Sequence, residues 1–333
     1  MNKVLTISIA AYNVADYIRE TLDSLVASKF IDDLEIFVVD DGGQDDTLAI
    51  AQDYQKRYPN SVIPVHKENG GYGTTVNYSL EHATGRYFKL LDGDDWVKTE
   101  SLDQLVEQLK KIETDLVVTP FLKGPSMAEM ELQDYSSQLP IAKEQQLSEL
   151  MNPPILGMWA MCYKTSVLRE SGLKLPEKLF YTDQIFCTIP IPFVKTIQYF
   201  DFPIYCYRLG RDGQSVSKES RIKNAQMTLD ICQELTSYIA KYKEHENYPY
   251  LLKRVSSYYL SALKTILLSP ISADTISRFK AYDQLIKQLS PEMYQVIVSE
   301  GKFGKIVRMA RQTNYLGLWL LSIIYKNGIK NWA

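Results

Sequence analysis

The sequence has little that would indicate a disulfide scaffold, a membrane span or a nucleic-acid binder. Its 333 residues include four cysteines and no C-x-x-C pair, which argues against a disulfide framework and the usual zinc motifs. No apolar run approaches the ~20 residues that cross a bilayer. The 37 basic and 40 acidic residues give a net charge of −3, so no basic excess points to nucleic acid as a partner. The composition, 45% hydrophobic and 23% charged, is that of an ordinary folded chain.

The apolar start of the chain indicates a strand and not a secretory signal. Residues 4–9 are rich in β-branched side chains, and no good cleavage site follows them. We therefore expect the protein in the cytoplasm.

Residues 1–120 alternate between short apolar runs and longer amphipathic segments. This alternation is typical of βαβ units, so it predicts an α/β fold with a mostly parallel sheet flanked by helices. Residues 121–165 are interrupted by proline and glycine, and we expect loops and short helices there. The expected strands are 4–10, 34–39, 61–65, 87–91 and 116–119, and the expected helices are 14–28, 45–58, 74–83 and 100–112.

The C-terminal part has a different character. From Arg221 onward the apolar spacing is that of long helices, which predicts a helical appendage ending near 291–301. The last 33 residues carry basic residues and no acid, and they form a basic amphipathic tail. This tail fits two interpretations equally well: a helix on the anionic inner face of the cell membrane, or a helix docked on the protein's own core. Its basic residues are Lys302, Lys305, Arg308, Arg311, Lys326 and Lys330, with Trp332 beyond them.

Acidic residues gather where two of the predicted parallel strands end. Asp40 and Asp41 close the second strand, and Asp92, Asp94 and Asp95 follow the fourth. Ligands of open parallel sheets bind outside the carboxyl ends of the strands, so these carboxylates are expected to meet at one edge. Carboxylate oxygens suit Mg²⁺ or Mn²⁺, which also bind phosphate. One Asp-Gly pair alone would indicate only a turn; two clusters together predict a site for a phosphorylated substrate.

Glycine is missing from the turn after the first strand, where Ala11, Tyr12 and Asn13 stand. This excludes the G-x-G-x-x-G loop of dinucleotide-dependent oxidoreductases, and the sequence also lacks the G-x-x-x-x-G-K-[ST] of P-loop enzymes. Tyr12 offers an aromatic ring that can stack on a base.

Four motifs together resemble glycosyltransferase family 2 of the bacterial surface-polysaccharide type. They are IAAYN at 9–13, VVDDG at 38–42, NGG at 69–71 and LLDGDD at 90–95, in the usual order. The resemblance implies a GT-A fold, a nucleoside diphosphate sugar donor, a divalent cation and inversion at the anomeric carbon. It covers 1–120 well and 150–217 more loosely. It thus implies a nucleotide-sugar-binding and catalytic domain at 1–217, followed by a helical domain at 218–333.

Carried over residue by residue, the resemblance implies a nucleotide site and a metal site. Tyr12 is expected to stack on the base, and Asp40 to accept a hydrogen bond from it. Asp94 is implied as the direct metal ligand, with Asp92 facing the ribose or a metal-bound water. The nucleotide contacts implied in this way are Ala11, Tyr12, Asn13, Asp40, Asn69, Gly70, Gly71 and Asp92.

The resemblance also implies a base and a loop that closes over the donor. Asp183 stands where family members place an acid that takes the proton of the acceptor hydroxyl, and Thr182 replaces the usual Glu before it. The alternative role of Asp183 is a helix N-cap. Residues 207–217 resemble this loop and contain Arg208 and Arg211. We expect these two arginines to bind the diphosphate, because this chain lacks the Arg that many relatives carry in the helix after the Asn-Gly loop. A solvated linker is the alternative there.

These features predict a metal-dependent inverting glycosyltransferase. The expected reaction moves a sugar from a UDP-sugar to a hydroxyl of a saccharide or lipid-linked saccharide acceptor. The alternative is a non-catalytic nucleotide-sugar-binding scaffold or sensor, which would bind the donor without turnover.

Overall fold

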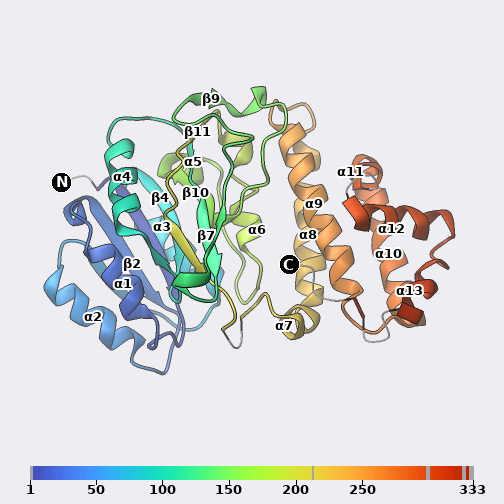
Figure 1. The fold of residues 1–333 in the computed structure, drawn as a ribbon, viewed down its shortest axis with the longest axis horizontal. Helices are drawn as coiled ribbons and strands as arrows, with labels where there is room; N and C mark the ends of the chain where they lie inside the picture. Colours follow the sequence, from blue (N-terminus) through green and yellow to red (C-terminus); the bar gives the residue numbers. More distant parts are fainter. Residues whose placement is uncertain (1–2, 212–213, 298–300, 325–327, 330–333) are drawn as a thin grey trace. The chain divides into compact units, whose positions relative to one another are not determined.

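The computed structural model describes residues 3–211, 214–297, 301–324 and 328–329. The chain divides into two units, Met1–Arg211 and Asp212–Ala333, which are described separately (Figure 1). Five residues of the expected loop and tail motifs lie outside the described residues: Asp212, Gly213, Lys326, Lys330 and Trp332.

Unit 1 is built on an eight-stranded sheet in the order β3-β2-β1-β4-β10-β6-β11-β9. The first four strands in this order pair in parallel, so their carboxyl ends share one edge. β1 lies between β2 and β4, and its last residue, Ala11, pairs with Asp40. The parallel strands are β1 (Leu5–Ala11), β2 (Leu34–Asp40), β3 (Val62–His66) and β4 (Tyr87–Asp92).

Amphipathic helices connect the parallel strands and flank the sheet (Figure 1). In α1 the apolar side chains of Ile18, Leu22 and Leu25 recur at helical spacing and are all buried. The fold class expected from the alternating pattern is confirmed. The expected helix over 14–28 covers only Ile18–Val26, because the chain first makes a turn in which Ile18 N donates to Val14 O. The connecting helices are α1 (Ile18–Val26), α2 (Thr47–Arg57), α3 (Tyr72–His82) and α4 (Thr99–Leu109).

The rest of unit 1 contains more strands than expected. Residues 121–165 contain three short 3-10 helices, as expected, but also four short strands where we expected only loops between the helices. A second sheet in the order β5-β12-β7-β8 brings residues 205–208 beside the chain that follows β4. The remaining elements are β5 (Trp96–Val97), β6 (Leu116–Val118), β7 (Phe121–Gly124), β8 (Glu131–Gln133), β9 (Glu144–Gln146), β10 (Met161–Lys164), α5 (Thr165–Glu170), α6 (Asp183–Phe186), β11 (Thr196–Tyr199) and β12 (Tyr205–Arg208).

Unit 2 is helical, as expected, but its helices continue beyond the expected end near 291–301. Two further helices include most of the basic tail. None of the helices among the described residues is both long and apolar enough to cross a membrane. The helices are α7 (Lys218–Lys223), α8 (Ala225–Ile239), α9 (Tyr248–Ile266), α10 (Ala273–Leu289), α11 (Pro291–Val296), α12 (Gly301–Gln312) and α13 (Leu318–Ile324).

A buried ion pair ties the tail to the core of unit 2. Asp283 of α10 is fully buried, and Arg311 of α12 donates to both of its oxygens at 2.9 and 2.7 Å. The hydroxyls of Tyr259 and Tyr315 donate to the same carboxylate. The apolar stripe of α12 also faces this core, where Val307 is completely buried. The first part of the tail is therefore a docked helix, and its remaining basic side chains are exposed.

Candidate active site

The strand ends of unit 1 are fastened together by main-chain hydrogen bonds. Asp41 N donates to Ala11 O over 2.8 Å, and Gly93 N donates to Ala10 O over 3.1 Å. A Cβ on Gly93 would lie 3.0 Å from Ala10 O, so the close approach of the two turns favours glycine. The turns after β1, β2 and β4 therefore meet at one edge, as expected from the sequence.

Three carboxylates converge in the turn after β4. Oxygen atoms of Asp92, Asp94 and Asp95 lie within 4.8 Å of one another. The tight turn that gathers them is closed by Asp95 N, which donates to Asp92 O over 3.1 Å. Asp95 already has its partners: Tyr205 Oη donates to one oxygen at 2.6 Å and Arg208 N to the other at 2.8 Å. Asp92 and Asp94 are left as the candidate cation ligands.

The electrostatics of this cluster also fit a divalent cation. Burial and the negative charges of Asp94 and Asp183 together raise the pKa of Asp92 to about 7. Burial and the charge of Asp92 raise the pKa of Asp95 as well. Asp92 Oδ1 is buried and has no hydrogen-bond partner among the described residues. An orphaned carboxylate oxygen in a group of like charges is what a bound Mg²⁺ or Mn²⁺ would satisfy.

The expected nucleotide contacts lie at the neighbouring strand ends. Asp40 is buried, and its two oxygens meet His66 Nδ1 at 2.6 Å and Gly43 N at 3.1 Å. Tyr12 is 53% exposed, so its ring is accessible to a base. Asn13 has a left-handed backbone, with φ of 51°, and its side chain accepts a hydrogen bond from Gln44 N over 2.8 Å.

A second carboxylate, Asp41, organises the loop of Asn69, Gly70 and Gly71. It accepts hydrogen bonds from Gly70 N at 3.0 Å and Gly71 N at 2.7 Å, and it pairs with Lys67 at 2.7 Å. Burial acts to raise the pKa of Asp41, but these hydrogen bonds and the Lys67 charge together lower it. The carboxylate is therefore ionised and holds the loop in place.

Asp183 lies within electrostatic reach of the acid cluster. It is the first residue of α6 and accepts a hydrogen bond from Gln184 Nε2 at 2.8 Å. Its negative charge contributes to the raised pKa values of Asp92 and Tyr72. The N-cap position of α6 belongs to Thr182, so capping does not account for Asp183.

The two arginines have different surroundings. Arg208 is anchored: Arg208 Nε donates to Asp94 O over 2.9 Å, and its guanidinium also pairs with Glu20 and lies 4.6 Å from the Trp96 ring centre. Arg211 Nε lies 2.7 Å from Asp94 Oδ2. Arg211 therefore contacts the side-chain carboxylate of a candidate metal ligand, and Arg208 contacts the main-chain oxygen of the same residue.

Sequence reasoning missed several residues that shape this site. It assigned no role to Asp41, although a second acid at the end of a buried strand needs hydrogen-bond partners. Tyr205 and Tyr72 carried no signal, because they are two of 23 tyrosines and reach the cluster only through folding. His66 could have been found from the pairing of β3 with β2, which sets it opposite Asp40.

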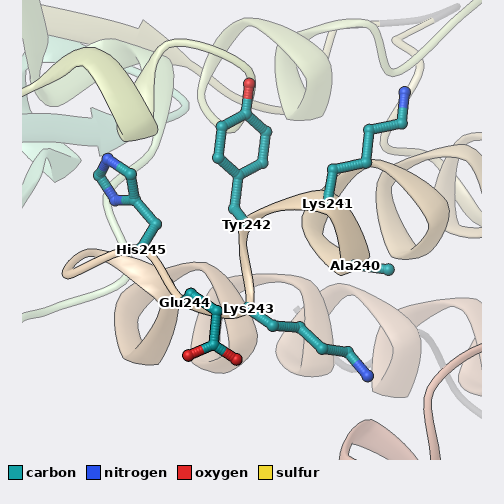
Figure 2. A pocket seen from close by; sticks show the side chains of 6 residues that line it. All are labelled: Ala240, Lys241, Tyr242, Lys243, Glu244 and His245. Atoms are coloured by element: carbon teal, nitrogen blue, oxygen red, sulfur yellow. The ribbon is translucent and has the colours of Figure 1, made fainter.

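A hollow lies in unit 2, on the connection between α8 and α9. It is lined by six consecutive residues, 240–245, of one turn. Figure 2 shows Tyr242 and Lys241 projecting to one side and Glu244 to the other. Because one turn supplies the whole lining and the charged side chains diverge, we assign this hollow no function.

Comparison with known proteins identifies the domain. Residues 6–170 match the model of the family described as glycosyl transferase family 2. The chain carries a glycosyl transferase family 2 domain. The family expected from the four motifs is thus confirmed, and with it the class of enzyme to which the domain belongs.

Several named relatives share this domain. The chain is 30% identical over 214 residues to putative glycosyltransferase EpsH of Bacillus subtilis, a match that spans 62% of this chain and 60% of EpsH. It is 28% identical over 218 residues to a poly(ribitol-phosphate) beta-glucosyltransferase of Bacillus spizizenii, covering 64% of this chain and 33% of that protein. The match therefore spans less than two thirds of the length of either relative.

Two proteins of known structure have the same fold. TarS of Staphylococcus aureus superposes with a TM-score of 0.69 at 18% identity, over 94% of this chain and 54% of TarS. Its 1–349 fragment in complex with UDP-GlcNAc superposes with a TM-score of 0.58 at 20% identity, over 93% of this chain and 92% of the fragment. Mannosyltransferase PcManGT of Pyrobaculum calidifontis, in complex with GDP-Man and Mn²⁺, superposes with a TM-score of 0.52 at 18% identity. The match covers 94% of this chain and 88% of PcManGT. The expected GT-A-like fold is confirmed.

Proposed function

We propose that the protein is a metal-dependent inverting glycosyltransferase. It moves a sugar from a UDP-sugar to a hydroxyl of a saccharide or lipid-linked saccharide acceptor. The observation that carries this proposal is the carboxylate cluster after β4, where Asp92 and Asp94 offer oxygen ligands at the same edge of the sheet as Asp40, with only β1 between their strands.

Asp94 and Asp92 would hold Mg²⁺ or Mn²⁺, which would supply positive charge to offset that of the diphosphate. Asp183 takes the proton of the acceptor hydroxyl while the bond between the acceptor oxygen and the anomeric carbon forms. The bond from that carbon to the diphosphate oxygen breaks on the opposite face, so the configuration inverts. Tyr12 stacks on the base, and Asp40 accepts a hydrogen bond from it.

The relatives support the choice of substrates. TarS was crystallised with UDP-GlcNAc, and a second relative is named for glucosyl transfer to poly(ribitol-phosphate). The first complex supports a UDP-sugar as donor, and the second name supports a hydroxyl-bearing polymer as acceptor. The Mn²⁺ in the mannosyltransferase complex supports a divalent cation.

Release of UDP from a panel of UDP-sugars, with saccharide acceptors and Mn²⁺, tests this function. Asp183→Asn removes the proton acceptor and is expected to slow transfer by about 10²–10⁴-fold without weakening UDP binding. Glu177→Gln, an exposed acid of the same loop, is the matched control and keeps the wild-type rate. An unchanged rate in Asp183→Asn would remove Asp183 from the mechanism. UDP binding without any transfer would favour the sensor alternative.

We also propose that the tail contacts an anionic membrane at the cytoplasmic face. Leu316 and Leu320 are 68% and 61% exposed, and Trp319 between them is 44% exposed. Exposed apolar and indole side chains next to a basic helix suit a lipid headgroup region. The exposed basic residues of that helix are Lys302, Lys305 and Arg308.

Co-sedimentation with phosphatidylglycerol vesicles tests this contact. Leu316→Ser with Leu320→Ser is expected to reduce binding, and Leu132→Ser, another exposed leucine, is not. Deleting the tail is a poorer test, because it removes Arg311 from the buried Asp283. Equal binding by all three proteins would refute membrane contact by the tail.

A further inference from the structure

Arg211 forms an ion pair with Asp94, whose carboxylate we propose as the direct cation ligand. Arg211 Nε lies 2.7 Å from Asp94 Oδ2, and the Asp94 side chain is 13% exposed. We propose that Arg211 and the divalent cation compete for Asp94, and that the displaced guanidinium then binds the diphosphate of the donor. This inference rests on the proposed function.

The guanidinium of Arg211 and a divalent cation would repel each other at the Asp94 carboxylate. A divalent ion binds its oxygen ligands at about 2.0–2.2 Å, shorter than the pair that Arg211 now makes. A guanidinium keeps its charge at every accessible pH, so it does not relieve the repulsion by losing a proton. Even a cation on the other oxygen of Asp94 lies only a few ångströms from Arg211, where like charges repel strongly.

The chain around Arg211 permits it to move while its neighbours stay. Arg208 is held through its main chain by Asp95, and Leu209 N donates to Gly124 O over 2.9 Å. Gly210 comes next, with φ of +84°, and a Cβ there would have only Pro125 Cβ within 4 Å, at 3.9 Å. A glycine in open space between a fixed strand and Arg211 is a suitable hinge.

The donor supplies a new partner for the released guanidinium. A diphosphate offers oxygen atoms that match the planar fork of arginine. Arg208 already pairs with Glu20, and the first turn of α3 carries Thr74 and Thr75 in place of an arginine. Arg211 therefore has a different partner in each state: Asp94 before the cation arrives, and the diphosphate afterwards.

Binding measurements without turnover test the competition. Mn²⁺ affinity is measured by electron paramagnetic resonance without nucleotide, and UDP affinity by calorimetry at saturating Mn²⁺. Arg211→Gln removes the charge, Arg211→Lys keeps it without the fork, and Arg57→Gln on the exposed surface of α2 controls for one lost positive charge. Arg211→Gln is expected to bind Mn²⁺ about fivefold more tightly and UDP about fivefold more weakly. Arg57→Gln changes neither affinity.

The outcomes separate the inference from the proposed function. Equal or weaker Mn²⁺ binding by Arg211→Gln refutes the competition, and unchanged UDP binding refutes the transfer of Arg211 to the diphosphate. If Arg211→Gln unfolds the protein, Arg211→Lys tests the inference instead. The inference then requires that Arg211→Lys keeps the wild-type Mn²⁺ affinity and binds UDP more weakly than the wild type does. A wild-type protein that binds neither Mn²⁺ nor UDP overturns the proposed function itself.

Discussion

The hydroxyl of Tyr205 joins two members of the acid cluster. Tyr205 Oη donates to Asp95 Oδ2 over 2.6 Å and accepts a hydrogen bond from Asp92 N over 3.1 Å. Tyr205 belongs to β12, so this one hydroxyl fastens the second sheet of unit 1 to the turn after β4. The geometry of the proposed cation site therefore depends on a residue more than 100 positions away in the chain.

Tyr205→Phe is expected to damage both stability and the cation site. It leaves a buried oxygen of Asp95 and the Asp92 N–H without this partner, at a cost of about 1–3 kcal/mol in the free energy of unfolding. Mn²⁺ affinity should fall as well. Tyr199→Phe, which removes a hydroxyl bonded to Asp134 away from the cluster, should change stability alone. Denaturant titration and Mn²⁺ binding separate the two effects; an unaltered Mn²⁺ affinity in Tyr205→Phe would contradict this account.

Asp41→Asn is expected to loosen the loop of Gly70 and Gly71. An amide offers one acceptor oxygen where the carboxylate has two, and its NH₂ group faces main-chain donors and Lys67. UDP binding should weaken by about tenfold, equivalent to ~1.4 kcal/mol. Asp46→Asn, an exposed acid five residues on, should bind UDP as the wild type does.

The stabilisation by Asp41 is also expected to depend on pH. The folded-state pKa lies below the ordinary 3.8, so the unfolded chain takes up the proton first as the pH falls. The contribution is therefore complete well above pH 3.8 and is lost as the pH falls through the lower, folded-state value. Unfolding free energies of wild type and Asp41→Asn should differ at pH 6 and converge at the acid end, and a constant difference would show that ionisation of Asp41 is not the cause.

Lys89 is expected to make stability depend on pH in the same direction as Asp41, but in the alkaline range. It is buried in β4, where Lys89 Nζ donates to Trp159 O at 2.7 Å, and burial lowers its pKa from 10.5 to about 8. Between these values the unfolded chain holds more protons than the folded one, so this residue's contribution to stability rises with pH. Relative to Lys89→Met, the free energy of unfolding of the wild type should rise by up to roughly 3 kcal/mol between pH 7.5 and 10.5. Parallel pH profiles for the two proteins would contradict the shifted pKa.

The ion pair in unit 2 offers a matched comparison within α12. Arg311→Met leaves Asp283 buried without its cation and should cost about 3–5 kcal/mol. Lys305→Met, at an exposed position of the same helix, should stay within about 0.5 kcal/mol of the wild type. Denaturant unfolding followed by circular dichroism measures both, and equal stabilities of the two variants would show that the buried pair contributes little.

The sequence was most informative where chemistry and periodicity coincide. The parallel strands end in the DDG and DGDD motifs, so alternation and motif together located the edge of the sheet that bears Asp40, Asp92 and Asp94. The short strands of 121–165 were missed because three or four residues show no measurable alternation, and their pairing partners lie far away in sequence.

The roles of individual side chains were harder to predict. Nothing local distinguishes Arg208 from Arg211, yet one is anchored to Glu20 and the other pairs with Asp94. Likewise, the regular spacing of basic residues in the tail concealed that Arg311 faces inward. The carboxylate that receives it, Asp283, lies on another helix, and only the folded chain brings the two together.

The hydrogen bonds that Asp41 accepts at the start of α3 bear on how the proposed donor would be bound. Main-chain amides at a helix N-terminus are a common cradle for phosphate. Here the protein's own carboxylate already fills that cradle at Gly70 and Gly71. A pyrophosphate arriving at this edge must be neutralised from the other side, by metal and guanidinium, so ionic composition of the medium should govern donor capture more strongly than in enzymes that leave the cradle empty.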